Sequence, residues 1–405
     1  MPLKLGPVLA CVLITVFVTV EIRAQTADRM IKIGVLTDLN SLFANASGSG
    51  SVTAAQMAVE DFRASHKGID AQVISADHQN KADIGSAIVR KWLEIDHVDA
   101  IVDVPNSSVA LAANEVVRGK HIALLASSTA TSDLTGPACS PNVIQWTFDT
   151  WSLANSTGKS IVESGGDTWF FLTSDFTFGQ ALQRDTAAVV TANGGKVLGA
   201  VRHPLNTADF SSFLIQAQAS NAKVIGLANS GGDAINSIKQ AREFGTTQKG
   251  QTLAALLFFI TDVHTVGLPN AEGLLLTEAF YWDLNEDTRT WSRRFAARNG
   301  GRMPTMNHAG VYSSVLAYLR AILATGSDDG ITVVNAIKAS KIADPLFGTV
   351  VVRADGRAVH DMYLFQVKAA TESQGPWDYY KVLKRIPGQG AFRGLDKGGC
   401  PLVKG

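Results

Sequence analysis

One order of apolar and polar positions repeats through the hundred residues that follow position 30. Short runs of β-branched and other apolar residues, typical of buried strands, occur at 31–36, 71–76, 98–104 and 121–126. Between them, apolar residues recur every three or four positions, as on one face of a helix, at 51–66, 83–96 and 107–118. Strands that alternate with amphipathic helices predict a parallel sheet with helices on both faces.

The same order begins again further along, after a connecting strand at 142–148 and a helix at 149–164. This second series predicts strands at 167–173, 194–203, 223–228 and 253–259, and helices at 178–193, 209–220 and 233–244. Later segments predict a strand at 274–280, helices at 288–299 and 308–325, and a strand pair within 347–367. Two such series predict an α/β protein with two doubly wound parallel-sheet lobes, between which the chain crosses more than once.

Composition and charge are those of a globular protein. The chain has 405 residues, of which 46% are apolar, and its 36 basic residues balance 36 acidic ones. This length suffices for two domains. The neutral balance gives no reason to expect nucleic acid or an anionic membrane as a partner.

The N-terminus has the pattern of a targeting segment. Lys4 precedes an apolar run at 7–20, and the small residue Ala24 follows it. This order predicts a secretory signal peptide over residues 1–24, and therefore export. A transmembrane anchor is the alternative, but an uncharged stretch of about 16 residues is shorter than the roughly 20 that a span requires.

Export would leave Cys139 and Cys400 in an oxidising compartment, where an even pair suggests a disulfide. Two buried free thiols are the alternative. The sequence has no CxxC, no HExxH and no clustered histidines and cysteines. We therefore expect neither a metal nor another cofactor.

Motifs that carry catalysis are incomplete. The segment around Ser230 lacks the first glycine of G-x-S-x-G. The segment at 156–160 resembles the end of a P-loop, but Leu153 stands where the motif requires glycine, and the glycine-rich segment at 47–54 lacks the third glycine of a dinucleotide loop. The sequence therefore predicts a protein that is not an enzyme and has no catalytic residue.

Hydroxyl-bearing residues gather where the strand at 121–126 ends, namely Ser127, Ser128, Thr129, Thr131 and Ser132. The segment "VPNSS" at 104–108 follows the neighbouring strand. Ligands of open α/β sheets bind at such strand ends, where helix N-termini also lie. The hydroxyls therefore suggest a site for a small anion, although turn and helix-cap chemistry would also favour serine and threonine here.

Four segments, "IKIGVLTDLNSLFANASGSGSVTAAQMAVEDF", "SSTATSDLT", "SDFTFGQAL" and "MNHAGVYSSVLAYLRA", together resemble the periplasmic solute-binding proteins of ABC importers, in the branched-chain amino acid and amide class. The resemblance implies a type I periplasmic-binding fold, with two lobes joined by a hinge, three crossings and a ligand between the lobes. It also implies a monomer in the periplasm that delivers a small molecule to an ABC permease in the inner membrane.

On this resemblance, the expected division after the signal peptide is lobe 1 at 28–147, lobe 2 at 148–279, lobe 1 again at 280–355, and the end of lobe 2 with the tail at 356–405.

The resemblance also implies binding residues. The family holds a substrate carboxylate with a serine after the third strand, here Ser107, and with hydroxyls and backbone N–H groups after the fourth, here Ser128, Thr129 and Thr131. Phe178 stands where the family has a tyrosine, and Asp262 stands where amino acid binders hold the ammonium group. Ordinary core packing is the alternative for Phe178, and helix capping on an exposed loop is the alternative for Asp262. Further expected wall residues are Phe43, Trp151, Asn229 and Tyr281.

We therefore expect an exported binding protein that closes on a small carboxylate-bearing solute, such as an amino acid or an aromatic acid. The small residues at 228–233 would leave room for a solute larger than leucine. Three alternatives are a soluble sensor that reports to a receptor, an exported hydrolase, and a repressor with the same two-lobe core. The failed motifs disfavour the hydrolase, and the apolar leader occupies the place of a DNA-binding helix pair.

Overall fold

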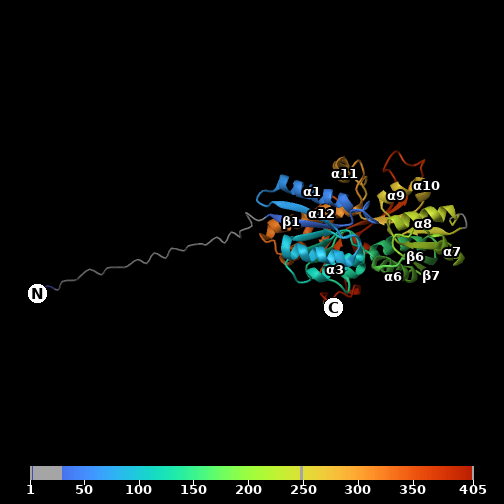
Figure 1. The fold of residues 1–405 in the computed structure, drawn as a ribbon, viewed down its shortest axis with the longest axis horizontal. Helices are drawn as coiled ribbons and strands as arrows, with labels where there is room; N and C mark the ends of the chain where they lie inside the picture. Colours follow the sequence, from blue (N-terminus) through green and yellow to red (C-terminus); the bar gives the residue numbers. More distant parts are fainter. Residues whose placement is uncertain (1, 3–29, 247–249, 404–405) are drawn as a thin grey trace.

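The computed structural model describes Pro2 and residues 30–246 and 250–403, and Figure 1 shows that they form two lobes lying side by side. Apart from Pro2, the expected signal peptide at 1–24 lies outside the described residues. Across these stretches, no helix combines the length and the apolar character that crossing a membrane would require.

The strands are β1 Ile31–Thr37, β2 Ala71–Asp77, β3 Ala100–Asp103, β4 Ala123–Ala126, β5 Val143–Gln145, β6 Thr168–Ser174, β7 Lys196–His203, β8 Val224–Ala228, β9 Thr252–Ala255, β10 Leu275–Glu278, β11 Lys341–Asp344, β12 Gly348–Val352, β13 Ala358–Val359, β14 Met362–Val367 and β15 Tyr380–Ile386.

The α-helices are α1 Gly48–Ser65, α2 Ala82–Lys91, α3 Ser107–Val117, α4 Thr150–Leu153, α5 Lys159–Glu163, α6 Thr177–Ala192, α7 Ser211–Ala219, α8 Gly232–Glu243, α9 Ile260–Val266, α10 Leu268–Ala271, α11 Glu286–Arg298, α12 Met306–Thr325, α13 Gly330–Ala339 and α14 Gly388–Ala391. Two π-helical segments, η1 Trp92–Asp96 and η3 Ala154–Gly158, and two 3-10 helices, η2 Ser132–Thr135 and η5 Leu395–Lys397, complete the set.

Lobe 1 is built on a five-stranded parallel sheet in the order β2-β1-β3-β4-β5. Alternate residues of its strands face opposite layers, as the period of two requires. Ile33 and Val35 pack with α1 and α12, whereas Leu36 and Ile101 pack with α2 and α3. The sheet is thus covered on both faces, and Figure 1 shows α1 and α12 on one side of lobe 1 and α3 on the other.

Lobe 2 repeats this plan with the parallel sheet β7-β6-β8-β9. Trp169 and Phe171 of β6 pack against α6, whereas Leu172 of the same strand packs with α7 and α8. The antiparallel sheet β10-β14-β15 adds to the second of these cores through side chains such as Phe365. The fold is therefore α/β, with two doubly wound lobes of parallel strands.

The chain passes between the lobes at four places. It leaves lobe 1 between β5 and α4, returns between β10 and α11, and leaves again between β13 and β14. After β15, the tail comes back to lobe 1, where Cys400 forms a disulfide with Cys139. The expected division stays a prediction, but its last part differs from these contacts, since β13 pairs with β12 in lobe 1 and Cys400 is bonded there.

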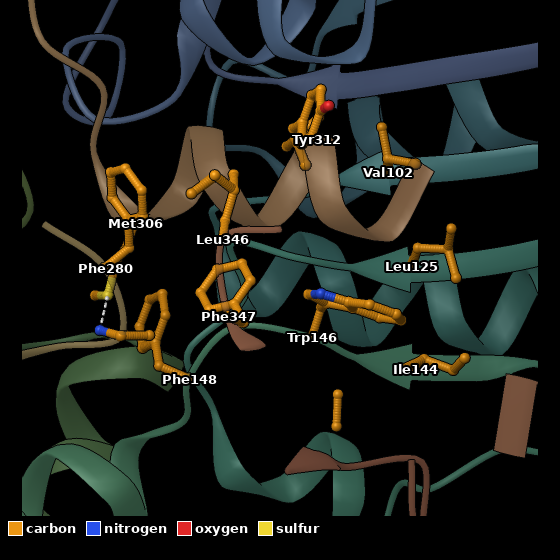
Figure 2. Packing of buried hydrophobic residues seen from close by; sticks show 14 of the residues in the cluster. Val102, Leu125, Ile144, Trp146, Phe148, Phe280, Met306, Tyr312, Leu346 and Phe347 are labelled. Atoms are coloured by element: carbon orange, nitrogen blue, oxygen red, sulfur yellow. Dashed lines mark hydrogen bonds between the residues drawn. The ribbon is translucent and has the colours of Figure 1, made fainter. Parts of the chain in front are cut away.

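One apolar core runs through the junction of the lobes. Figure 2 shows Phe148, Phe280 and Met306 close together beside the first turn of α12, next to Trp146 and Phe347. The backbone N–H of Ala279 points to Met306 Sδ at 3.5 Å, a contact between the residue that follows β10 of lobe 2 and α12 of lobe 1. The two lobes therefore share buried apolar surface.

The sequence missed some elements and extended others. The strand expected at 253–259 ends at Ala255, because Phe258 and Phe259 lead into α9 instead. Helix α13 and strand β15 were not expected, although Asp329 caps α13 through its side chain. The helix expected at 149–164 is continuous but has π-helical geometry in its middle.

Candidate functional site

A small cavity lies where the two lobes meet. It is lined by Phe43, Ala46, Pro105, Ser128, Ala130, Phe148, Phe178, Ser230, Leu257, Phe259 and Asn307. Lobe 1 supplies the strand ends and the start of α12, and lobe 2 supplies the segments that follow β6, β8 and β9. Its volume of about 20 Å³ would hold roughly one water molecule.

Aromatic side chains make up much of the wall. Phe148 and Phe259 meet edge to face, with ring centroids 6.5 Å apart, and Phe178 lies 5.8 Å from Phe176. Phe43, Phe148, Phe178 and Phe259 are all at least nine-tenths buried. None of the eleven lining residues carries a formal charge, so the wall suits an apolar body with few polar groups.

The floor on the lobe 1 side is the junction of β3 with the hydroxyl-rich loop. Asp103 and Val104 have φ angles of 78° and 58°, which non-glycine residues rarely adopt. This turn places the Asp103 N–H 3.1 Å from Ser127 Oγ, and the Asp103 carbonyl accepts from the Ser128 N–H at 3.0 Å. Both the strand end and the loop are thereby fixed.

The hydroxyl protons of Ser128 and Thr129, two residues of the expected anion site, already have acceptors. Ser128 Oγ donates to Asp103 Oδ1, and Thr129 Oγ1 donates to the carbonyl of Val104 at 2.6 Å. Ser128 lines the cavity, whereas Thr129 does not. The Thr129 side chain therefore holds the loop to β3, and any contact with a solute would come from its backbone.

Ser107 and Thr131 lie beside this floor without lining the cavity. Ser107 Oγ accepts from the Thr131 N–H at 3.2 Å, and Thr131 Oγ1 accepts from the Asp133 N–H at 3.3 Å as the cap of η2. Asn106 caps α3 through bonds to the N–H groups of residues 108 and 109. These side chains shape the two strand ends, and of the four expected hydroxyls only that of Thr131 caps a helix.

Asp103 was not expected as a site residue. Its carboxyl is fully buried, and burial raises its pKa to about 6, although the hydrogen bond from Ser128 and the nearby hydroxyls of Thr37, Ser51 and Ser47 oppose this rise. Asp103 Oδ2 has no hydrogen-bond partner among the described residues. A polar residue at the end of the buried run "AIVD" was the available sequence signal.

Two more polar side chains face the cavity, one from each lobe. Ser230 follows β8 and Asn307 lies in the first turn of α12. Ser230 Oγ and Asn307 Oδ1 are buried, and within the described parts of the chain neither has a hydrogen-bond partner. Asn229, an expected wall residue, instead points to His203 Nε2 at 3.2 Å and does not line the cavity.

Asp262, expected to hold an ammonium group, is not among the residues that line the cavity. It is fully buried, and its Oδ2 accepts from the Phe259 N–H at 3.0 Å at the start of α9. Burial raises its pKa to about 7. The carboxyl caps its own helix, and through Phe259 it fixes part of the cavity wall.

Two expected wall residues also lie elsewhere. Trp151 lies beneath the guanidinium of Arg393, 5.9 Å from it, near the C-terminal tail. Tyr281 donates to the carbonyl of Trp377 at 3.2 Å within lobe 2. Of the expected residues, the structure brings Ser128, Phe178 and Phe43 to the cavity, and sequence reasoning missed Phe148, Phe259, Ser230 and Asn307.

Polar contacts close the rim between the lobes. Ser108 of α3 and Thr177 of α6 share a hydrogen bond at 2.8 Å, and Arg184 of α6 pairs with Asp133 at 3.0 Å. Gly231 lies so near lobe 1 that a Cβ atom there would be 2.4 Å from the carbonyl oxygen of Leu42. Its φ of 59° also favours glycine. The described side chains contain no group of three or more metal-ligating residues.

Comparison with known proteins identifies the family. The model of the family described as "Periplasmic binding protein" matches residues 30–374. A periplasmic binding protein from Burkholderia mallei is 46% identical, with a TM-score of 0.90 over 93% of this chain and 99% of that one. A branched-chain amino acid ABC transporter periplasmic ligand-binding protein from Burkholderia xenovorans is 37% identical, with a TM-score of 0.82 over 92% of this chain and 100% of that one.

A more distant structure shares the fold alone. A solute-binding protein of an ABC transporter from R. palustris, in complex with benzoate, is 19% identical, with a TM-score of 0.80 over 92% of this chain and 100% of that one. These likenesses agree with the two lobes of parallel strands and with a type I periplasmic-binding fold. The chain belongs to the periplasmic binding protein family of ABC transporters.

Proposed function

We propose that this protein is exported to the periplasm, captures a small apolar carboxylate between its lobes and delivers it to an ABC permease. The observation that carries the proposal is the cavity at the junction of the lobes, where four phenylalanines face a hydroxyl-rich strand end. An apolar body would contact the phenylalanines. Its carboxylate would lie at the floor, near Ser128 and the backbone N–H groups of the loop after β4.

Lobe movement is part of this proposal. The cavity has room for about one water molecule, so an organic solute enters only if the lobes separate. The hydrogen bond between Ser108 and Thr177 and the ion pair between Arg184 and Asp133 join the two lobes across the rim and would break on opening. Ligand contacts from both lobes would then favour the closed form over the open one.

The cavity favours an acid without an α-ammonium group. An ammonium in a dry site is best held by a carboxylate, and Asp262 is directed to its own helix instead. Ser230 and Asn307 offer only neutral atoms. An aromatic or branched carboxylate, with one further polar substituent able to meet Ser230 or Asn307, therefore matches the wall better than leucine. The benzoate bound by the R. palustris protein is an aromatic carboxylate without this further substituent.

Calorimetry on the purified mature chain, with benzoate, 4-hydroxybenzoate, 3-phenylpropanoate, isocaproate, leucine and phenylalanine, tests the proposal. We expect the simple acids to bind at micromolar or tighter affinity, and the corresponding amino acids to bind at least tenfold more weakly. Small-angle scattering should show the molecule becoming more compact on binding. Binding confined to amino acids would refute the ligand class, and conversion of a bound acid to product would favour a hydrolase.

A further inference from the structure

We propose that Asp103 is a positioning residue that sets the direction of the Ser128 hydroxyl, so that binding of a carboxylate in the cavity is coupled to uptake of one proton by Asp103. This inference rests on the proposed function, because it concerns the same cavity and requires an anionic ligand. It adds a residue that touches no solute and a linkage between pH and affinity.

The first observation concerns the hydroxyl proton of Ser128, which is already donated to Asp103. A serine hydroxyl has one proton, and here it is directed to Asp103 Oδ1. Ser128 is 2% exposed and lines the cavity, so the side of its oxygen that faces a solute presents lone pairs. Lone pairs repel a carboxylate, and the wall carries no cation that would compensate.

The second observation is that hydrogen bonds hold the backbone of Asp103 in one position. Its N–H and its carbonyl are both bonded to the loop that contains Ser127 and Ser128. Positive φ angles at Asp103 and Val104 turn the strand end in order to make these bonds. Strained backbone of this kind persists only where the surrounding structure holds it, and it is concentrated at functional sites.

The third observation is the neighbourhood of the carboxyl. The groups that most influence it, apart from burial, are the hydroxyls of Ser128, Thr37, Ser51 and Ser47. Asp103 Oδ2 has no hydrogen-bond partner among the described residues, so no donor on that side stabilises the ionised carboxylate. Burial raises the pKa of this carboxyl to about 6, so a proton is held there at modest cost near neutral pH.

The coupling follows from the geometry. A solute carboxylate and an ionised Asp103 would face each other across one hydroxyl, and two such anions cannot both stay ionised cheaply. When Asp103 takes a proton from solvent on Oδ1, the oxygen bonded to Ser128, its carboxyl can donate to Ser128 Oγ. The Ser128 proton can then turn toward the solute and donate to its carboxylate. No covalent bond other than the O–H bond of Asp103 is formed.

Other titratable groups near this floor keep their charge state. Asp38 follows Thr37 on β1; burial opposes its ionisation, but hydrogen bonds from Phe43, Ser41 and Asn80 outweigh this and lower its pKa. His78 at the end of β2 and His308 on α12 have pKa values lowered to about 4 by burial. Between pH 5 and 8, the group at this floor that titrates is therefore Asp103.

Isothermal titration calorimetry with benzoate, in buffers of different ionisation enthalpy, measures the uptake directly. For the wild-type chain we expect nearly one proton taken up per benzoate at pH 7 to 8, and little at pH 5. The affinity should fall about tenfold for each pH unit above 6. Absence of proton uptake at pH 7.5 would overturn the inference while leaving the proposed function intact, whereas failure of every carboxylate to bind would overturn both.

The variant Asp103→Asn tests whether Asp103 is the group that takes up the proton. Its side-chain amide can donate to Ser128 Oγ at any pH, so we expect benzoate binding without proton uptake and with pH-independent affinity. The matched control is Asp233→Asn, since burial raises the pKa of Asp233 to about 6 as well, but this residue binds the N–H groups of Asn206 and Thr207 in lobe 2. It should keep the wild-type uptake.

Uptake that persists in Asp103→Asn would assign the proton to another group and refute the proposal. The wild-type measurement stands even if this variant fails to fold. In that case ¹³C NMR of the Asp103 carboxyl in the wild-type chain replaces the measurement on the variant. The carboxyl resonance should shift to the protonated position when benzoate is added at pH 7.5, and an unchanged resonance would contradict the coupling.

Discussion

The hydroxyl of Tyr380 donates to Glu278 Oε1 at 2.8 Å, inside the part of the molecule where the lobes are connected. Glu278 ends β10, and the backbone groups of Ile260 and Met306 also bond to its carboxyl. Met306 begins α12 of lobe 1, so one buried carboxyl contacts segments of both lobes. Burial raises the pKa of Glu278 to about 8, and the nearby Asp262 adds to this rise.

Stability should therefore fall as the pH rises above neutral. Glu278 and Asp262, with pKa values of about 8 and 7, hold protons in the folded state that the unfolded chain releases near pH 4. Their stabilising effect is complete at low pH and is lost as the pH rises through these raised values. Between pH 6.5 and 8.5 we expect the free energy of unfolding to fall by roughly 2–3 kcal/mol, measured by urea denaturation.

Below pH 6.5 buried histidines oppose this trend. His78, His308 and His360 have pKa values lowered to about 4 by burial, so the unfolded chain binds protons there that the folded chain does not. The Glu278→Gln variant should lose most of the slope above neutral pH, whereas Glu272→Gln, at an exposed position, should retain it. A wild-type slope in Glu278→Gln would show that another group carries the effect.

Each of the two cysteines should stabilise the chain only through its bond to the other. Cys139 and Cys400 are separated by 261 positions and are 0% and 5% exposed. Closing so long a loop restricts the unfolded chain, so removal should cost about 2–5 kcal/mol. The single Ser variants and the double variant should lose the same amount in chemical denaturation. Additive losses would mean that the two sulfurs stabilise the chain independently.

Asp262→Asn should leave discrimination between amino acids and simple acids unchanged. The side chain caps α9 through the Phe259 N–H, and an asparagine oxygen can accept the same bond. The ratio of the affinities for leucine and isocaproate should therefore stay within about twofold of wild type. Asp262→Ala removes the cap and should weaken both ligands together. A selective loss of leucine binding in the Asn variant would restore the ammonium role.

Phe178→Leu should weaken binding of aromatic acids about tenfold, or ~1.4 kcal/mol, because an aromatic contact in the cavity wall is lost. The matched control is Phe210→Leu, a fully buried phenylalanine of lobe 2 that does not line the cavity. This control should lower thermal stability and leave affinity unchanged. Equal affinities for wild type and Phe178→Leu would remove Phe178 from the site.

Gly231→Ala should hinder closure of the lobes. The added Cβ would lie 2.4 Å from the carbonyl oxygen of Leu42, at a φ of 59° that alanine disfavours. We expect weaker ligand binding and a scattering profile that stays extended when ligand is added. Gly232→Ala is the control, since its Cβ would meet the Leu42 side chain at an ordinary 3.5 Å. Normal compaction of Gly231→Ala would show that this contact does not limit closure.

Periodicity was sufficient to predict the two sheets. Strands such as β1 and β6 have continuous apolar runs because both of their faces are buried, and helices such as α1 show the spacing of one covered face. The error at 253–259 arose because a buried helix start is as apolar as a strand. Periodicity alone cannot distinguish these two in a run of seven residues.

The site was harder to derive because its geometry depends on register between distant segments. Ser128 lies in the cavity wall, but its proton is directed to Asp103, 25 positions earlier in the chain. Asp262 follows a strand, as expected for a residue facing a cleft, yet the start of α9 turns its carboxyl back to Phe259. The acceptor of the Ser128 proton therefore cannot be identified from the sequence around Ser128.

The bond between Cys139 and Cys400 has a mechanical consequence. Fourteen positions separate Ile386, the last residue of β15 in lobe 2, from the cysteine anchored on lobe 1. This stretch connects the two lobes with a fixed number of residues, so it limits how far the lobes can separate. An oxidised chain and a reduced one would accordingly differ in the largest cargo that they admit.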